Sequence, residues 1–204
     1  PASLTKIMTA LVLLDHGFDP AAVVTISRRA ATTGGARIGL RSGQEMTAGD
    51  LFAAMLVPSA NDACMALAEH DSGTVEAFVT RMNERAATMG LSATHFGNPC
   101  GLDAPGHRSS VRDLFRLTQA ALALPVFTRT VSLERATVRV LGGQVFSLQS
   151  SHALLGRFPG AFGVKTGYTN AAGRCVAAGA ERGGVRVIAV LLDAPDRWWA
   201  VAGL

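Results

Sequence analysis

The sequence predicts an α+β fold in which a lobe of helices packs against an antiparallel sheet. Helical patterns fill the middle of the chain, between residues 47 and 124, and strand patterns lie at its C-terminal end, at 163–193. Residues 4–16 are apolar on nearly every face of a helix, as in a helix that is buried inside a protein. We therefore expect a single domain with a helical lobe at about 18–160 and a sheet part at about 161–194.

Cap residues define the first elements. Gly17 suits the C-terminal cap of the buried helix, because glycine tolerates the left-handed conformation found there. Residues 23–27 are a short strand candidate. Thr47 followed by Asp50 resembles a capping box, so a helix should begin there and run to about Leu56.

Three further helices are expected in the lobe. Residues 62–70 form the next one, after a break. Residues 74–90 carry apolar side chains on one face, which predicts an amphipathic helix. Ser110 and Asp113 form another capping pair, so a helix should cover 111–124.

Strands dominate the C-terminal part of the chain. Residues 135–148 alternate weakly around two glycines, which is consistent with a hairpin. Residues 163–168, 174–181 and 185–193 indicate three strands, and the last two are joined around Gly183-Gly184.

Composition excludes several classes of protein. Hydrophobic residues make up 49% of the chain and charged residues 17%, which argues against disorder. No apolar run reaches the roughly 18 residues needed to span a membrane. The net charge of +4 could favour anionic polymers or lipid headgroups, but no dense Lys/Arg run marks a face for nucleic acid. We therefore expect no nucleic-acid partner.

The three cysteines, Cys64, Cys100 and Cys175, are an odd number and lack the spacing of metal ligands. Cys64 lies in a helical pattern and Cys175 in a strand pattern, so both should pack as small apolar side chains. We expect no metal site, no required disulfide between Cys100 and Cys175, and no cysteine that takes part in catalysis.

Ser3 and Lys6 form the first candidate catalytic motif. Their spacing at a helix start places both side chains on one face. Serine needs an adjacent base to act as a nucleophile. A lysine in apolar surroundings can lose its proton, because burial disfavours the charged form. Taken alone, the segment 3–6 would more often be a helix cap with a solvated lysine. The apolar run that follows it favours a catalytic pair.

Ser59 and Asn61 form the second motif, which follows Pro58 in a break between two helices. The Ser59 hydroxyl could project into a cleft there and relay a proton to a leaving amine. Asn61 offers both a donor and an acceptor to a substrate backbone. Ser59 could equally cap the helix that begins near Asp62, and both roles are compatible.

The third motif, Lys165-Thr166-Gly167, lies on a predicted strand and is followed by Tyr168. A glycine there permits close approach of a ligand backbone, which could pair with the strand. Lys165 would remain protonated and bind an anionic terminus, and Thr166 would hydrogen-bond a carboxylate. The backbone N–H groups of Ser3 and Tyr168 are candidates for an oxyanion hole. An exposed lysine on an edge strand is the commoner interpretation of these three residues alone.

Together and in this order, the motifs resemble those of the serine D-alanyl-D-alanine carboxypeptidases, the low-molecular-mass penicillin-binding proteins of the peptidase S11 type. The resemblance covers essentially the whole chain. Other segments similar to the family include Pro1–Ala10, Pro58–Ala63, Ala66–His70, Thr94–Phe96, Gly101–Asp103 and Gly163–Thr169.

The resemblance implies a serine β-lactamase/penicillin-binding-protein-like transpeptidase fold, here lacking the strands that precede the nucleophile in the family. The chain would then be a truncated catalytic domain. It implies removal of the terminal D-alanine from peptidoglycan stem peptides, and covalent inhibition by β-lactams, with no metal or organic cofactor. The implied location is periplasmic or extracytoplasmic, at the cell-wall face of a bacterial membrane. Peripheral attachment to that membrane would use a segment absent here.

The resemblance carries roles over to individual residues. Ser3, Lys6 and Ser59 would be catalytic. The substrate-binding residues would be Asn61, Lys165, Thr166, Gly167 and Tyr168.

Three alternatives remain open. A DD-endopeptidase that cuts cross-links would share all three motifs. A class A-like β-lactamase would need a deacylating Glu, but no Glu-x-x-Leu-Asn arrangement lies between Asn61 and Lys165. A non-catalytic peptidoglycan-binding module is the third, and the intact Ser3 and Lys6 argue against it.

Overall fold

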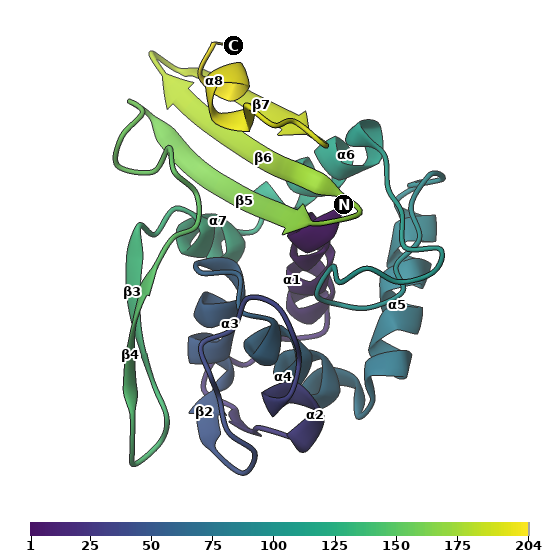
Figure 1. Cartoon of the computed structure of the whole chain (residues 1–204), viewed down its shortest axis with the longest axis vertical. Helices are drawn as coiled ribbons and strands as arrows, with labels where there is room; N and C mark the ends of the chain where they lie inside the picture. The colour runs from purple at the N-terminus through teal and green to yellow at the C-terminus, as the bar shows by residue number, and fades with distance from the viewer. Residues whose placement is uncertain (204) are drawn as a thin grey trace.

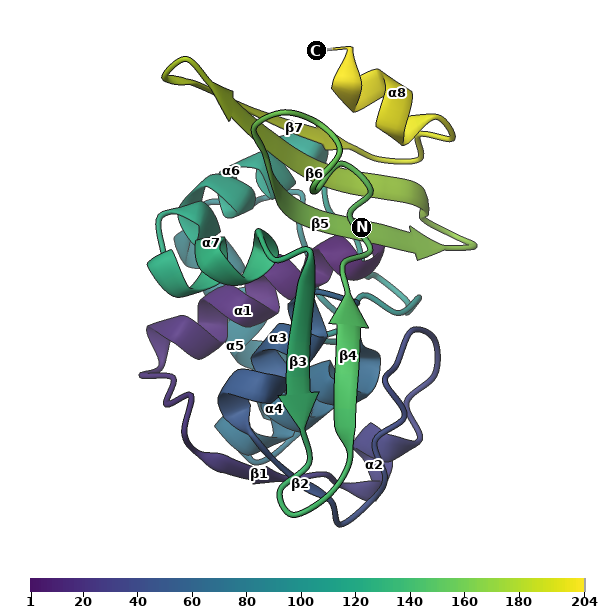
Figure 2. The same cartoon turned by 90° about the vertical axis from the view of Figure 1, so that its left-hand side faces the viewer.

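The computed structural model describes residues 1–203 and shows a three-stranded antiparallel sheet lying over a lobe of helices (Figure 1). The strands are β5 (Ala161–Thr169), β6 (Gly173–Arg182) and β7 (Val185–Leu191), in the order β5-β6-β7. Figure 2 shows helices on opposite faces of this sheet, α1 (Lys6–Asp15) on one and α8 (Arg197–Ala202) on the other. The α+β class expected from the sequence is confirmed.

The lobe contains the helices that the sequence predicted and two that it did not. Its helices are α2 (Arg28–Ala31), α3 (Ala48–Leu56), α4 (Asn61–Ser72), α5 (Val75–Thr88), α6 (Val111–Leu122) and α7 (Pro125–Val131). The short helices α2 and α7 were not predicted. The helix expected to reach residue 124 ends two residues earlier, because Leu124 adopts an extended conformation before Pro125.

Two small hairpins complete the fold. The first pairs β1 (Val23–Thr25) with β2 (Glu45–Thr47), and the sequence did not reveal β2 because three residues are too few to show an alternation. The second, β3 (Arg135–Arg139) and β4 (Val145–Gln149), is the predicted hairpin. None of the helices within residues 1–203 is both long enough and apolar enough to cross a bilayer.

The structure confirms that Ser110 and Thr47 cap helices, but it does not show the capping box expected at Thr47 and Asp50. Ser110 Oγ accepts a hydrogen bond from the Asp113 N–H at 3.2 Å, as its cap position predicts. Thr47 Oγ1 likewise accepts one from the Asp50 N–H. However, the Asp50 carboxylate does not complete a capping box. It accepts a hydrogen bond at 2.9 Å from the N–H of Arg139, which anchors the hairpin to α3.

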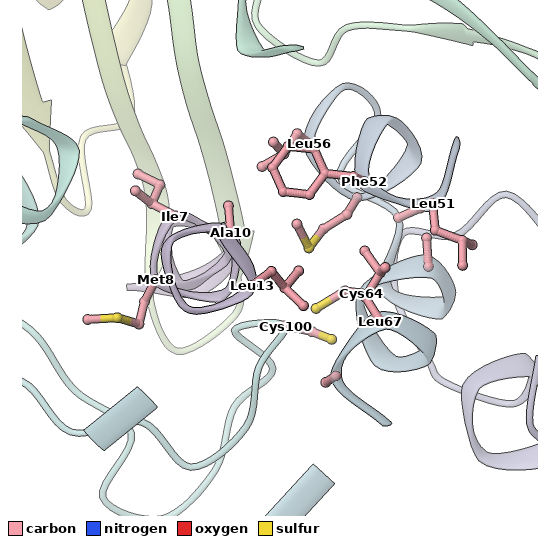
Figure 3. Close-up of a cluster of buried hydrophobic side chains, with 14 of the residues drawn as sticks. Ile7, Met8, Ala10, Leu13, Leu51, Phe52, Leu56, Cys64, Leu67 and Cys100 are labelled. Atoms are coloured by element: carbon pink, nitrogen blue, oxygen red, sulfur yellow. The ribbon is translucent and has the colours of Figure 1, made fainter. Parts of the chain in front are cut away.

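Helix α1 forms the centre of the molecule. Each of its residues from Lys6 to Leu13 is buried, in agreement with the apolar pattern on all of its faces. Figure 3 shows Ala10 and Leu13 facing side chains of α3 and α4, including Phe52 and Leu67. Contacts with α1 therefore fix the position of η1, the turn that precedes it, relative to both the lobe and the sheet.

Candidate active site

The predicted nucleophile lies in a short 3-10 turn, η1 (Ala2–Thr5), which leads directly into α1. Ala2 has a φ of 49°, a conformation that is uncommon for a residue with a side chain and that indicates local strain. Ser3 Oγ lies 3.0 Å from Lys6 Nζ. The serine and the lysine therefore meet on one face, as their spacing predicts.

Lys6 is fully buried, and three oxygen atoms surround its nitrogen. Besides Ser3 Oγ, Asn61 Oδ1 accepts a hydrogen bond from Nζ at 2.6 Å, and the carbonyl oxygen of Cys100 accepts another at 2.7 Å. The contacts with Asn61 and Cys100 fix the position of the nitrogen. The third contact places it at hydrogen-bond distance from the Ser3 hydroxyl, the geometry that a proton transfer between the two would need.

Asn61 is the first residue of α4 and links Lys6 to a loop of the lobe. Its Nδ2 donates to the Gly34 carbonyl at 2.7 Å, and its backbone N–H donates to the Ala36 carbonyl at 2.7 Å. Both polar ends of the side chain are thus engaged within the protein. The hydrogen bond that Asn61 accepts from Lys6 positions the lysine, and this role of Asn61 was not predicted from the sequence. The second N–H of Nδ2 and the second lone pair of Oδ1 would still be available to a substrate.

The next residue, Asp62, holds the same loop with a fully buried carboxylate. Its Oδ2 accepts hydrogen bonds from the N–H groups of Gly39, at 2.9 Å, and Leu40, at 3.0 Å. Charge-assisted bonds of this kind are about twice as strong as neutral ones. They keep the loop closed over the start of α4.

A tight turn directs the Cys100 carbonyl toward the lysine. Asn98 Oδ1 accepts hydrogen bonds from three successive N–H groups, those of Cys100, Gly101 and Leu102, at 3.1, 2.8 and 3.0 Å. Gly101 has a φ of 84°, and a Cβ at this position would overlap the carbonyl of Ala2. Glycine is therefore required here for both conformation and space.

Ser59 lies in the break between α3 and α4, as predicted, with a positive φ of 71°. This conformation costs free energy in any residue that has a side chain, and such strain is often found at functional sites. Its hydroxyl is buried and has no hydrogen-bond partner within residues 1–203. A substrate group could therefore bind Ser59 Oγ without displacing an existing partner.

Lys165 lies on β5 and is 1% exposed. Its Nζ donates to the carbonyl of Thr166 at 3.2 Å. Burial lowers the pKa of Lys165 well below its usual range, and the nearby charge of Lys6 lowers it further. Burial therefore opposes the positive charge that the motif indicates, and the charged state of Lys165 stays a prediction. An anionic ligand would favour the protonated form.

The segment that follows Lys165, from Thr166 to Tyr168, also lies on β5. This strand pairs with β6 on one side only within the described residues, so its other edge is free. Thr166 Oγ1 lies 2.6 Å from Ser151 Oγ. A Cβ on Gly167 would lie 3.0 Å from the backbone nitrogen of Ser3, so the strand passes very close to the nucleophile turn. The Tyr168 side chain is exposed.

Three residues near β5 were not singled out from the sequence: Ser151, His152 and Arg197. His152 is buried, its ring packs edge-on against Trp198, and burial together with the charge of Lys165 lowers its pKa to about 4. Arg197 Nη1 donates to the carbonyls of Gly167, at 2.8 Å, and Cys175, at 3.0 Å. No short motif contains these residues, and only the tertiary fold brings them to the site. Residues 1–203 contain no cluster of three side chains suited to hold a metal ion.

The site thus combines a serine in contact with a lysine, a second unpartnered serine and a strand edge next to the nucleophile. This combination has the geometry that an acyl-transferring enzyme with a serine nucleophile and a neighbouring base would need. The chain belongs to the peptidase S11 family of D-alanyl-D-alanine carboxypeptidases, whose match covers residues 1–196.

Individual relatives support this assignment. The chain is 39% identical to the D-alanyl-D-alanine carboxypeptidase DacF of Bacillus subtilis, over 95% of its own length and 51% of that protein. It also resembles the crystal structure of a D-alanyl-D-alanine carboxypeptidase from Mycobacterium tuberculosis, with a TM-score of 0.91 and 35% identity, over 99% of this chain and 78% of that one.

A Streptomyces DD-transpeptidase has the same fold, with a TM-score of 0.86 and 30% identity, over 94% of this chain and 79% of that one. The predicted transpeptidase fold is therefore confirmed. The chain spans about half the length of most of the curated relatives that it matches.

Proposed function

We propose that this chain carries the catalytic centre of a serine-type DD-carboxypeptidase, which removes the terminal D-alanine from peptidoglycan stem peptides. The observation that carries the proposal is the set of contacts around Lys6. Its nitrogen lies 3.0 Å from Ser3 Oγ, and Asn61 and Cys100 hold it there with uncharged oxygen atoms. Family membership supplies the substrate class.

Acylation begins with attack of Ser3 Oγ on the carbonyl of the penultimate D-alanine, as Lys6 takes the hydroxyl proton. Negative charge then develops on the carbonyl oxygen. The backbone N–H groups of Ser3 and Tyr168 would stabilise it, and the close approach of Gly167 to the nucleophile turn supports this placement.

The leaving amine must gain a proton before the terminal D-alanine departs. Ser59 would relay it: its hydroxyl would donate a proton to the amine and accept in return the proton that Lys6 took from Ser3, so that Lys6 is neutral again and Ser59 is unchanged. The Ser59 hydroxyl is buried and has no partner among residues 1–203, which leaves it available for this relay. Water then hydrolyses the acyl-enzyme and regenerates Ser3. No step in this scheme requires a metal or an organic cofactor.

Two buried groups on β5 would bind the substrate carboxylate. Lys165 has a single hydrogen-bond acceptor among residues 1–203, and the next residue, Thr166, offers a hydroxyl. The carboxylate would raise the pKa of Lys165 from its lowered value and so hold it in the charged form. Arg197, on α8, adds a second positive charge next to Gly167.

β-Lactams would acylate the same serine, because they resemble the D-alanyl-D-alanine dipeptide. We further propose that the protein acts outside the cytoplasm, at the cell wall, where this substrate is found.

The decisive experiment incubates the protein with purified stem peptides and with cross-linked dimers. Release of free D-alanine from pentapeptide, lost in Ser3→Ala, supports the proposal. Cleaved dimers without free D-alanine would instead identify a DD-endopeptidase. Rapid turnover of penicillin would identify a β-lactamase, and binding of peptidoglycan with no reaction would identify a non-catalytic module.

Intact-mass spectrometry with a labelled penicillin provides a second test. We expect one adduct per chain and none in Ser3→Ala. An adduct that persists in that variant would show that Ser3 is not the acylation site.

A further inference from the structure

Cys64 and Cys100 lie next to each other in the core beneath the active site. They come from different elements, Cys64 from the second turn of α4 and Cys100 from the turn after Asn98. Figure 3 shows their sulfur atoms side by side between α4 and the loop that carries Cys100. Both side chains are at most 1% exposed. The sequence did not indicate this pair, because the two cysteines are 36 positions apart.

The two cysteines belong to the same two segments as the groups that accept hydrogen bonds from Lys6. Cys64 is one helical turn after Asn61, whose side chain accepts a hydrogen bond from Lys6. Cys100 supplies the carbonyl that accepts a second one. In addition, Cys100 Sγ lies 3.6 Å from the Asn61 carbonyl oxygen. A bond between the two sulfurs would therefore join the two elements that hold the lysine.

We propose that Cys64 and Cys100 form a disulfide when the protein folds in an oxidising environment, and that this bond stabilises the elements around Lys6. The third cysteine does not compete for it. Cys175 lies on β6, and its Sγ contacts the carbonyls of Ala172, at 3.4 Å, and Gly173, at 3.8 Å.

The reaction requires a two-electron oxidant of the disulfide class, such as glutathione disulfide. The thiolate of one cysteine attacks the oxidant, breaks its S–S bond and releases one glutathione thiolate. The second cysteine thiolate attacks the mixed disulfide, forms the intramolecular S–S bond and releases the other. The two cysteines lose two protons and two electrons, and the oxidant becomes two glutathione thiols.

The timing of this reaction follows from burial. In the folded protein, burial raises the pKa of the Cys100 thiol well above its usual range, and the neighbouring Cys64 thiol raises it further. A protonated, buried thiol reacts slowly. The bond should therefore form during folding, before the core closes, and resist both formation and reduction afterwards. This inference concerns the chain itself, and only its physiological setting depends on the proposed location outside the cytoplasm.

The test refolds the reduced, urea-unfolded chain in a glutathione redox buffer. We expect the mass to fall by about two protons, the number of titratable thiols to fall from three to one, and peptide mapping to find a Cys64–Cys100 linkage. Cys175→Ala should still form the bond, whereas Cys64→Ala and Cys100→Ala should not. Three free thiols after refolding, or a bond that involves Cys175, would overturn the proposal.

Stability provides a second readout. A bond that closes a loop of this size should raise the melting temperature by at least about 5 °C in the wild type and in Cys175→Ala. The Cys64→Ala variant, treated identically, should show no such shift. Equal melting temperatures of the oxidised and reduced wild type would contradict the stabilising role. Because the readouts are thiol count and melting temperature, they remain informative even if the proposed peptidase activity is not found.

Discussion

The amide oxygen of Asn61 lies 2.6 Å from the nitrogen of Lys6, although the two residues are 55 positions apart. An amide can accept a hydrogen bond without adding negative charge. The lysine is thus held in place by a neutral partner and not by a salt bridge. This matters because a carboxylate at the same place would stabilise the ammonium form, which cannot accept a proton.

The first prediction is that Asn61→Asp slows acylation of Ser3 by at least about 100-fold, because the new carboxylate would hold Lys6 in its charged form. The measurement is the rate of acylation by a labelled penicillin. Asn61→Ala serves as the control, since it removes the hydrogen bond without adding charge. It should retain more activity than Asn61→Asp, and the reverse order would refute this role for the amide.

The two buried lysines should respond differently to the same substitution. Lys6→Arg should abolish acylation, because arginine stays protonated at any ordinary pH and cannot act as a base. Lys165→Arg should weaken substrate binding but leave measurable acylation, because a positive charge is retained. Rates at saturating and limiting penicillin separate the two effects. Identical behaviour of the two variants would show that the lysines do not have distinct roles.

The close approach of Gly167 to the nucleophile turn gives a third prediction. In Gly167→Ala, the new Cβ would lie 3.0 Å from both the Ala2 Cβ and the Ser3 nitrogen, so one of the two segments must shift. We expect acylation to fall by at least about tenfold while the melting temperature changes by only a few degrees. Gly143→Ala is a matched control, because its Cβ would make only an ordinary contact with Val140. Equal effects of both variants on acylation would contradict the prediction.

The parts of the site that sequence reasoning found are those with a local cause. Ser3 and Lys6 meet because residues three apart share a helix face. Ser59 lies in a break between two helices, which Pro58 predicts. The parts it missed depend on backbone groups or on distant segments. The carbonyl of Cys100 cannot be recognised from its residue type, since every residue has one. The hydroxyl of Ser151 reaches Thr166 only through the tertiary fold.

The burial of Lys165 could not be predicted for a related reason. The motif indicated a cation, but the pKa of the amine depends on how much solvent and how many charges surround the nitrogen. Burial and the proximity of Lys6 follow from how β5 packs against η1, and neither is visible in the order of residues. In the fold itself, the long periodic helices were predicted well. The short elements α2, β2 and α7 were not, because fewer than two helical turns or four strand residues give no clear period.

The last prediction concerns the stability of the protein in acid. Burial lowers the pKa of His152 to about 4, and it lowers the pKa of His107 to about 4 as well. The unfolded chain, with an ordinary histidine pKa of about 6.5, binds more protons than the folded protein between those two values. The neutral histidines therefore contribute their full stability above pH 6.5, and this contribution is lost as the pH falls toward 4.

For His152, the more deeply buried of the two, the loss should be on the order of 3 kcal/mol. Urea unfolding at pH 7, 5.5 and 4 measures it. His152→Phe, which cannot titrate and can still pack against Trp198, should flatten the fall in unfolding free energy over this range. His70→Gln, at an exposed position, should leave the slope unchanged. If His152→Phe and wild type lose the same free energy between pH 7 and pH 4, the acid sensitivity arises elsewhere in the protein.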